Sequence, residues 1–128
     1  MLSLTEYADH DAVGLAELVR GGEVSAAEVL DTALAAIAAL NPQLNAVINV
    51  MEDEARAQVA ALTPGAPLGG VPMLLKDLKL SYAGVATNCG SRLFQGWTRD
   101  FDSEILRRWK GAGLIALGKS NTPELGQA

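Results

Sequence analysis

The chain has 128 residues, of which 49% are hydrophobic and 20% charged, and its formal net charge is -5. This length corresponds to about one domain, and the composition is typical of a protein with a buried core rather than of a disordered tail. The negative charge, with no cluster of Lys and Arg, argues against a nucleic acid as partner, and no apolar run reaches the ~18 residues that span a bilayer.

The first part of the chain is predicted to be helical. Apolar residues recur on one side of a helix over residues 11–20, and the pair of glycines that follows supplies a stop signal. A second helix begins after Ser25, whose side chain can form a capping box with Glu28. Its apolar stripe is interpreted as core packing, and we expect Asn41-Pro42 to end it.

Two short apolar segments follow, separated by a helix. Residues 46–50 predict a compact strand, and residues 52–62 predict a helix with an acidic first turn. A loop rich in Pro and Gly over residues 63–70 leads into a buried strand over residues 71–75. Strand, helix and strand at this spacing predict a βαβ unit, in which the two strands are parallel and the crossover is right-handed.

The last third of the chain is predicted to be an irregular segment, a helix and a strand. Glycines among short polar stretches indicate an irregular surface segment over residues 79–101. Asp102 or Ser103 can cap a helix that ends near Gly111, and residues 114–117 predict a third parallel strand. The side chains of that helix expected to face inward are Ile105, Leu106 and Trp109.

Together these elements predict an α/β fold, with N-terminal helices followed by βαβ units whose strands are mostly parallel. We treat residues 1–128 as a single fragment, mainly helical with one strand over 1–62 and richer in strands over 63–128. A helix start at residues 122–124 is followed by only four residues, which is too short for a stable helix. We therefore expect the chain to be part of a longer domain.

The segment GGVPMLLKDL, residues 69–78, places a lysine at the end of an apolar strand. Lysine is rarely buried, so Lys76 either extends its ammonium into solvent along its aliphatic stem or is desolvated for use as a base. Composition alone favours the exposed alternative. Asp77 would oppose a role as base if the two side chains met, but consecutive residues of a strand point to opposite faces.

Residues 113–120 match the phosphate-binding pattern G-x-x-x-x-G-K-S letter for letter. A phosphate loop needs flexible residues between its glycines and must follow a strand. Here the intervening residues are themselves a strand and follow a helix, so we interpret Gly118-Lys119-Ser120 as a turn and not as a nucleotide site.

The single cysteine, Cys89, cannot form an internal disulfide, which suits a reducing cytoplasm. With His10 as the only histidine, a Cys/His metal site has too few ligands, and we expect neither metal nor cofactor. Cys89 could act as a nucleophile if a base were in reach, but a small buried cysteine is favoured. The first twenty residues lack the apolar segment of a secretory signal.

Four blocks in this order resemble the N-terminal part of the amidase signature family: residues 69–78, 84–91, 102–113 and 118–124. The resemblance covers essentially the whole chain and implies an incomplete amidase-signature α/β domain. Members of this family hydrolyse or transfer amide groups with a Ser–cis-Ser–Lys triad, and Lys76 matches the triad lysine. In that scheme the neutral lysine takes a proton from the bridging serine, which takes one from the nucleophile.

The sequence departs from the family pattern at both serines of the triad. The bridging serine and the nucleophile belong to a Gly/Ser-rich segment further along, and no such segment occurs before Ala128. Ser81, Ser91, Ser103 and Ser120 do not match those positions. The resemblance therefore implies a part that is inactive by itself and depends on a second chain, or on a missing C-terminal part, for its serines.

The resemblance implies an amidase that cleaves C–N bonds of small carboxamides or of linear or cyclic oligoamides. One alternative is the amide-transferring subunit of an aminoacyl-tRNA amidotransferase, which requires partner subunits. Another is a non-catalytic truncated scaffold that associates with other chains through exposed strand edges. A nucleotide-binding module is the most distant alternative, and the preferred acyl group and the oligomeric state stay open.

Overall fold

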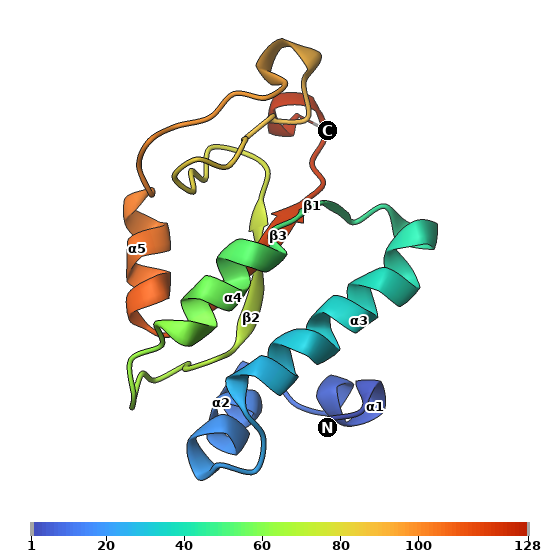
Figure 1. The fold of residues 1–128 in the computed structure, drawn as a ribbon. Helices are drawn as coiled ribbons and strands as arrows, with labels where there is room; N and C mark the ends of the chain where they lie inside the picture. Colours follow the sequence, from blue (N-terminus) through green and yellow to red (C-terminus); the bar gives the residue numbers. More distant parts are fainter. Residues whose placement is uncertain (1, 128) are drawn as a thin grey trace.

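The computed structural model describes residues 2–127 and consists of a small sheet between helices (Figure 1). The helices are α1 (Leu4–Ala8), α2 (Ala12–Gly21), α3 (Ala26–Leu44), α4 (Glu52–Ala60) and α5 (Glu104–Gly111). The strands are β1 (Val47–Val50), β2 (Pro72–Lys76) and β3 (Ile115–Ser120), and two short 3-10 turns cover Arg92–Phe94 and Glu124–Gly126.

The first helices begin and end at the signals that the sequence carries. The Asp11 side chain accepts a hydrogen bond from the backbone of α2, and Gly22 ends this helix with a φ of 74°. The capping box between Ser25 and Glu28 is present at the start of α3, as predicted. The same S-x-x-E signal at residues 3–6 begins α1, a helix that was not predicted.

The predicted end of α3 was wrong. The helix continues through Pro42 to Leu44 and is capped by Asn45, whose φ is 48°. A proline this close to the end removes a hydrogen bond from the last turn only. Beyond the proline, the side-chain amide of Asn41 donates to the carbonyl of Val47 and accepts from its N–H, both at 2.8 Å. This pair of hydrogen bonds fastens the end of α3 to β1.

The sheet is mixed, with strand order β1-β3-β2. Strand β3 is parallel to β2 and antiparallel to β1, so the predicted parallel βαβ unit from β1 through α4 to β2 is wrong. Because β1 is only four residues long, α4 carries the chain onward to the start of β2 instead of folding back beside β1 (Figure 1). The actual βαβ unit is β2–α5–β3.

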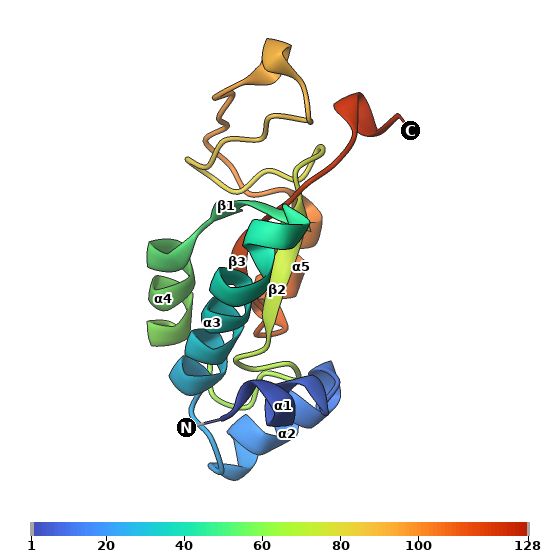
Figure 2. The ribbon, with the colours of Figure 1, turned by 90° about the vertical axis from the view of Figure 1, so that its right-hand side faces the viewer.

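Helices cover both faces of the sheet (Figure 2). On one face, α3 and α4 pack on β3 through Leu30, Ala55 and Leu117. On the other face, Leu106 of α5 packs between Leu75 and Ala116. The prediction of an inward-facing side chain was right for Leu106, but Ile105 is 44% exposed because it lies on the outer side of α5.

The irregular segment predicted over residues 79–101 is present within residues 77–103, which extend from the carboxyl end of β2 to α5 (Figures 1 and 2). It is not wholly a surface segment, because Ser81, Val85 and Thr87 are buried. Its final part is held by Asp102, whose carboxylate accepts from the Ala83 N–H at 2.8 Å and from Lys110 Nζ at 2.6 Å. The Lys110 ammonium also lies 3.7 Å from the centre of the Tyr82 ring. These contacts join the irregular segment to α5.

The contribution of Asp102 to stability is expected to depend on pH. Partial burial raises the pKa of this carboxyl, but the hydrogen bonds from Lys110 and Ala83 outweigh burial and lower it overall. A carboxyl with a lowered pKa stabilises the fold above its ordinary value of 3.8, and this stabilisation is lost as the pH falls below that value. Asp102→Asn should therefore reduce the free energy of unfolding by about 1 kcal/mol near pH 7.

The measurement is urea denaturation of the parent and of Asp102→Asn between pH 7 and pH 3. The difference between the two proteins should shrink as the solution is acidified. A difference that stays constant over this range would contradict the assignment to the ionised carboxylate.

Candidate active site

Lys76 lies at the carboxyl end of β2 with its side chain exposed. Its two neighbours in sequence, Leu75 and Asp77, are both fully buried. Leu74, two residues earlier, is exposed like Lys76, as expected for side chains that alternate between the faces of a strand. The predicted separation of Lys76 and Asp77 onto opposite faces agrees with this burial pattern.

The register of β2 and β3 sorts the polar residues at this edge into two groups. Lys76 is the partner of Ser120, and Leu75 is the partner of Lys119. Because partners in neighbouring strands point to the same face, Lys76 and Ser120 share one face, and Lys119 points to the opposite face, where α5 packs. The carboxyl ends of parallel strands are where sites gather in α/β sheets.

Lys119 is fully buried, which corrects the interpretation of residues 118–120 as a turn. These residues belong to β3, which is longer than predicted because it pairs with a strand on each side. Lys119 Nζ donates to the carbonyl oxygen of Leu80 at 2.8 Å and to Thr87 Oγ1 at 2.7 Å. Burial lowers the pKa of Lys119, and the negative charge of Asp77 acts in the opposite direction.

Close packing around Gly118 explains why the G-K-S pattern has a glycine at this position, without any role in binding phosphate. A Cβ at this position would lie 2.6 Å from the carbonyl oxygen of Asn49 and 3.3 Å from side-chain atoms of Leu74 and Val47. Glycine is therefore needed where β3 passes closely between its two neighbours. The strand runs through the residues that would have to form a phosphate loop, so the geometry excludes that loop, as predicted.

Cys89 is buried, with 6% of its surface exposed, as the sequence favoured. His10, the base that a cysteine nucleophile would need, instead follows α1, and its Nδ1 lies 2.8 Å from the carbonyl oxygen of Glu6. Ser91 donates from Oγ to Glu124 Oε1 at 2.8 Å, which links the irregular segment to the last described residues. This contact gives Ser91 a structural role.

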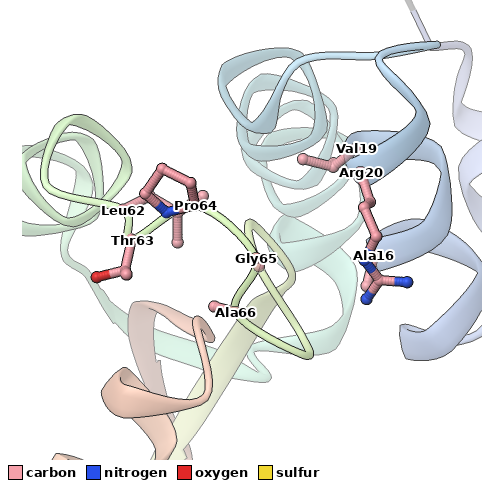
Figure 3. A pocket seen from close by; sticks show the side chains of 9 residues that line it. Ala16, Val19, Arg20, Leu62, Thr63, Pro64, Gly65 and Ala66 are labelled. Atoms are coloured by element: carbon pink, nitrogen blue, oxygen red, sulfur yellow. The ribbon is translucent and has the colours of Figure 1, made fainter.

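A cavity of about 320 Å³ lies at a different place, between α2 and the loop over residues 62–69 (Figure 3). Figure 3 shows Val19 and Arg20 on one side and Leu62 and Thr63 on the other. The Arg20 guanidinium donates to the carbonyl oxygen of Pro67 at 3.0 Å. The cavity lacks an acid–base pair, and Lys76 is not among its lining residues.

Within residues 2–127, no helix combines the length and the apolar character needed to cross a membrane. The same part of the chain holds no group of three or more His, Cys, Asp or Glu side chains that could bind a metal ion.

Sequence reasoning missed the buried partnership around Lys119. Its acceptors lie 39 and 32 residues away along the chain, so no local sequence pattern indicates them. The signal that could have found it is the apolar strand predicted over residues 114–117. If this strand is extended by three residues, to Ser120, Lys119 lies within it and next to the strand that carries Lys76.

Comparison with known proteins finds a match between residues 28–128 and the amidase family model. The chain is 41% identical over 118 residues to the 6-aminohexanoate-cyclic-dimer hydrolase of Paenarthrobacter ureafaciens, covering 91% of this chain and 24% of that protein. It is also 41% identical over 128 residues to a subunit of the glutamyl-tRNA(Gln) amidotransferase of Salinispora arenicola, covering 94% of this chain and 26% of that protein.

Solved structures agree with the sequence matches. The 6-aminohexanoate cyclic dimer hydrolase complexed with substrate has a TM-score of 0.86 at 38% identity, over 91% of this chain and 24% of that one. The native peptide amidase of Stenotrophomonas maltophilia has a TM-score of 0.81 at 35% identity, over 92% and 26% of the two chains. The chain thus spans about a quarter of the length of these relatives.

Proposed function

Because this chain belongs to the amidase family, we propose that it is the N-terminal part of an enzyme that hydrolyses carboxamide C–N bonds. Lys76 is the lysine of a Ser–cis-Ser–Lys triad, and residues outside this chain supply the two serines. The observation that carries the proposal is the place of Lys76 in a chain that matches the amidase family over residues 28–128: it is the last residue of β2 and lies between two fully buried neighbours.

The proposed reaction begins with proton transfers that end at Lys76. The neutral amine accepts the proton of the bridging serine while that serine accepts the proton of the nucleophilic serine. The nucleophile attacks the amide carbon, the C–N bond breaks, and the leaving amine takes a proton back through the bridging serine. Water then attacks the acyl-enzyme by the same relay and releases the carboxylic acid.

Apolar surface on the same face of β2 as Lys76 supports a site that is completed by other residues. A groove of about 310 Å³ runs between α3 and β2, lined by apolar side chains such as Ile37, Leu74 and Leu117. Leu40 and Leu44 continue the same stripe of α3 and are exposed. Apolar surface of this kind is usually covered in a folded protein, which supports a larger domain to which this chain contributes one part.

The first test compares the isolated chain with a fusion. In the fusion, which we call the completed amidase, this chain replaces the matching N-terminal quarter of the Paenarthrobacter hydrolase. We expect the completed amidase to cleave the 6-aminohexanoate cyclic dimer and the isolated chain to show no turnover, because the isolated chain lacks the serines. Release of free amine measures both.

Two outcomes would count against the proposal. Turnover by the isolated chain would mean that its own residues supply the nucleophile. A completed amidase that unfolds cooperatively on heating, and is therefore folded, but has no activity would mean that residues 1–128 cannot serve as this part of an amidase.

The amide-transferring alternative is supported by the equal identity to the Salinispora protein, over 94% of this chain. A second fusion, with the remainder of that protein and with its partner subunits present, distinguishes the two. If the chain belongs to a transferase, this second fusion should amidate glutamyl-tRNA, and the completed amidase should be inactive on the cyclic dimer.

A further inference from the structure

Lys119 is a buried charge that the proposed reaction does not use. It is the largest of the fully buried side chains among the described residues, and it lies on the face of the sheet opposite Lys76. Removing an ammonium group from water is costly, and an apolar residue of the same length would fill this space without that cost. A buried lysine at this position therefore needs a purpose beyond packing.

The ammonium of Lys119 binds the segment that follows Lys76. Nζ donates to the carbonyl oxygen of Leu80 and to the hydroxyl of Thr87. The Thr87 hydroxyl in turn donates to the same Leu80 carbonyl oxygen at 3.2 Å, so the three groups form a closed triangle. One side chain of β3 thereby holds two points of the irregular segment, seven residues apart.

Asp77, the residue directly after Lys76, is fixed by the same arrangement. Its carboxylate is fully buried and accepts from the Asn88 N–H at 3.0 and 3.2 Å. Its own N–H donates to the carbonyl oxygen of Ser120 at 3.1 Å. Because Asn88 directly follows Thr87, the Lys119 contact and the Asp77 contact fix adjacent residues of the segment.

We infer that Lys119 is a positioning residue for Lys76: by tying Leu80 and Thr87 to β3, its ammonium fixes the backbone on the carboxyl side of Lys76 and holds the Lys76 side chain on the face of the sheet opposite α5. The inference rests on the proposed function of Lys76. Lys119 points to the opposite face and acts through Asp77 and its neighbours, so it takes no part in the proton transfers.

The inference predicts a specific change in two measurements when the ammonium is removed. In Lys119→Met, the isolated chain should lose about tenfold or more of its hydrogen-exchange protection at the amides of Asp77 and Asn88. In the completed amidase, kcat per folded molecule should fall about 10- to 100-fold, because a misplaced proton acceptor loses its alignment with the reacting groups. KM should change less than about twofold, since the removed group does not bind substrate.

Three further variants accompany Lys119→Met: one control, one second test of the Lys119 contact, and one test of the proposed function. Lys79→Met removes an exposed lysine of the same segment and should leave both measurements at parent values. Thr87→Val removes only the hydroxyl that Lys119 binds and should lower kcat in the same direction with unchanged KM. It replaces Lys119→Met as the decisive variant if the latter does not fold. Lys76→Ala tests the proposed function itself.

The outcomes distinguish the positioning role of Lys119 from the proposed function of Lys76. Parent values of kcat and of exchange protection in folded Lys119→Met and Thr87→Val, together with an inactive Lys76→Ala, would overturn the positioning role and leave the proposed function intact. An active Lys76→Ala would overturn the proposed function, and the positioning role with it. A loss of exchange protection with unchanged kcat would show that Lys119 only stabilises the fold and would also overturn the inference.

Discussion

Lys76→Ala in the completed amidase is expected to lower kcat by about a thousandfold or more, because the relay then has no final proton acceptor. The fold should be unaffected. In the isolated chain this side chain is exposed, and substitution of an exposed residue changes the free energy of unfolding by about 0.5 kcal/mol at most. Initial rates of the completed amidase on the cyclic dimer and thermal unfolding of the isolated chain measure the two effects.

Lys76→Arg tests whether the side chain at position 76 must be able to lose and accept a proton. Arginine keeps the positive charge and much of the length, but its guanidinium does not give up its proton in proteins. We expect this variant to be as inactive as Lys76→Ala, whereas a lysine that merely attracts a negative group would tolerate arginine. Lys79→Ala, three residues along the chain, is the matched control and should keep full activity. Retention of more than about a tenth of the parent kcat in Lys76→Ala would exclude Lys76 from the triad.

Gly118→Ala is expected to destabilise the fold by about 2–3 kcal/mol, the cost of overpacking a closely packed site. The added Cβ would meet the carbonyl oxygen of Asn49 at 2.6 Å, and this oxygen belongs to the backbone of a paired strand, which cannot move aside alone. Urea denaturation should show a lower midpoint with an unchanged m-value.

Gly111→Ala is the matched control for Gly118→Ala. Gly111 ends α5, and a Cβ there would meet no atom within 4 Å. Alanine should therefore stabilise the protein by about 0.5–1 kcal/mol, because glycine loses more backbone freedom on folding. If Gly118 served a phosphate loop, Gly118→Ala would leave stability unchanged. Equal midpoints for the parent and Gly118→Ala would thus contradict the packing explanation.

Local signals of the sequence were sufficient for most helices and for the position of Lys76. Capping residues such as Asp11 and Ser25 act within one turn of their own helix, so their effect can be predicted from neighbouring residues. The apolar run before Lys76 likewise predicts a strand with the lysine at its end, as observed in β2. The family match over residues 28–128 agrees with the resemblance stated from the motifs.

Strand pairing could not be predicted in the same way. Whether β1 lies parallel or antiparallel to its neighbour depends on the path of the chain through α4, and sequence spacing alone suggested the wrong answer. The true length of β3 depends on hydrogen bonds to β1 and β2, which the residues of β3 do not encode by themselves. The α3 terminus was missed for a similar reason, since Asn41 is satisfied by Val47 across a turn.

The sequence by itself determined the helix boundaries that depend on caps, the apolar strand that ends at Lys76, and the family to which the motifs belong. Only the tertiary structure decided that Lys119 is buried and bound to Leu80 and Thr87, because its partners come from a distant segment. The physical reason is the distance along the chain between the residues that interact. Capping and periodicity act between residues a few positions apart, whereas burial and strand pairing depend on contacts that form only when the whole chain has folded.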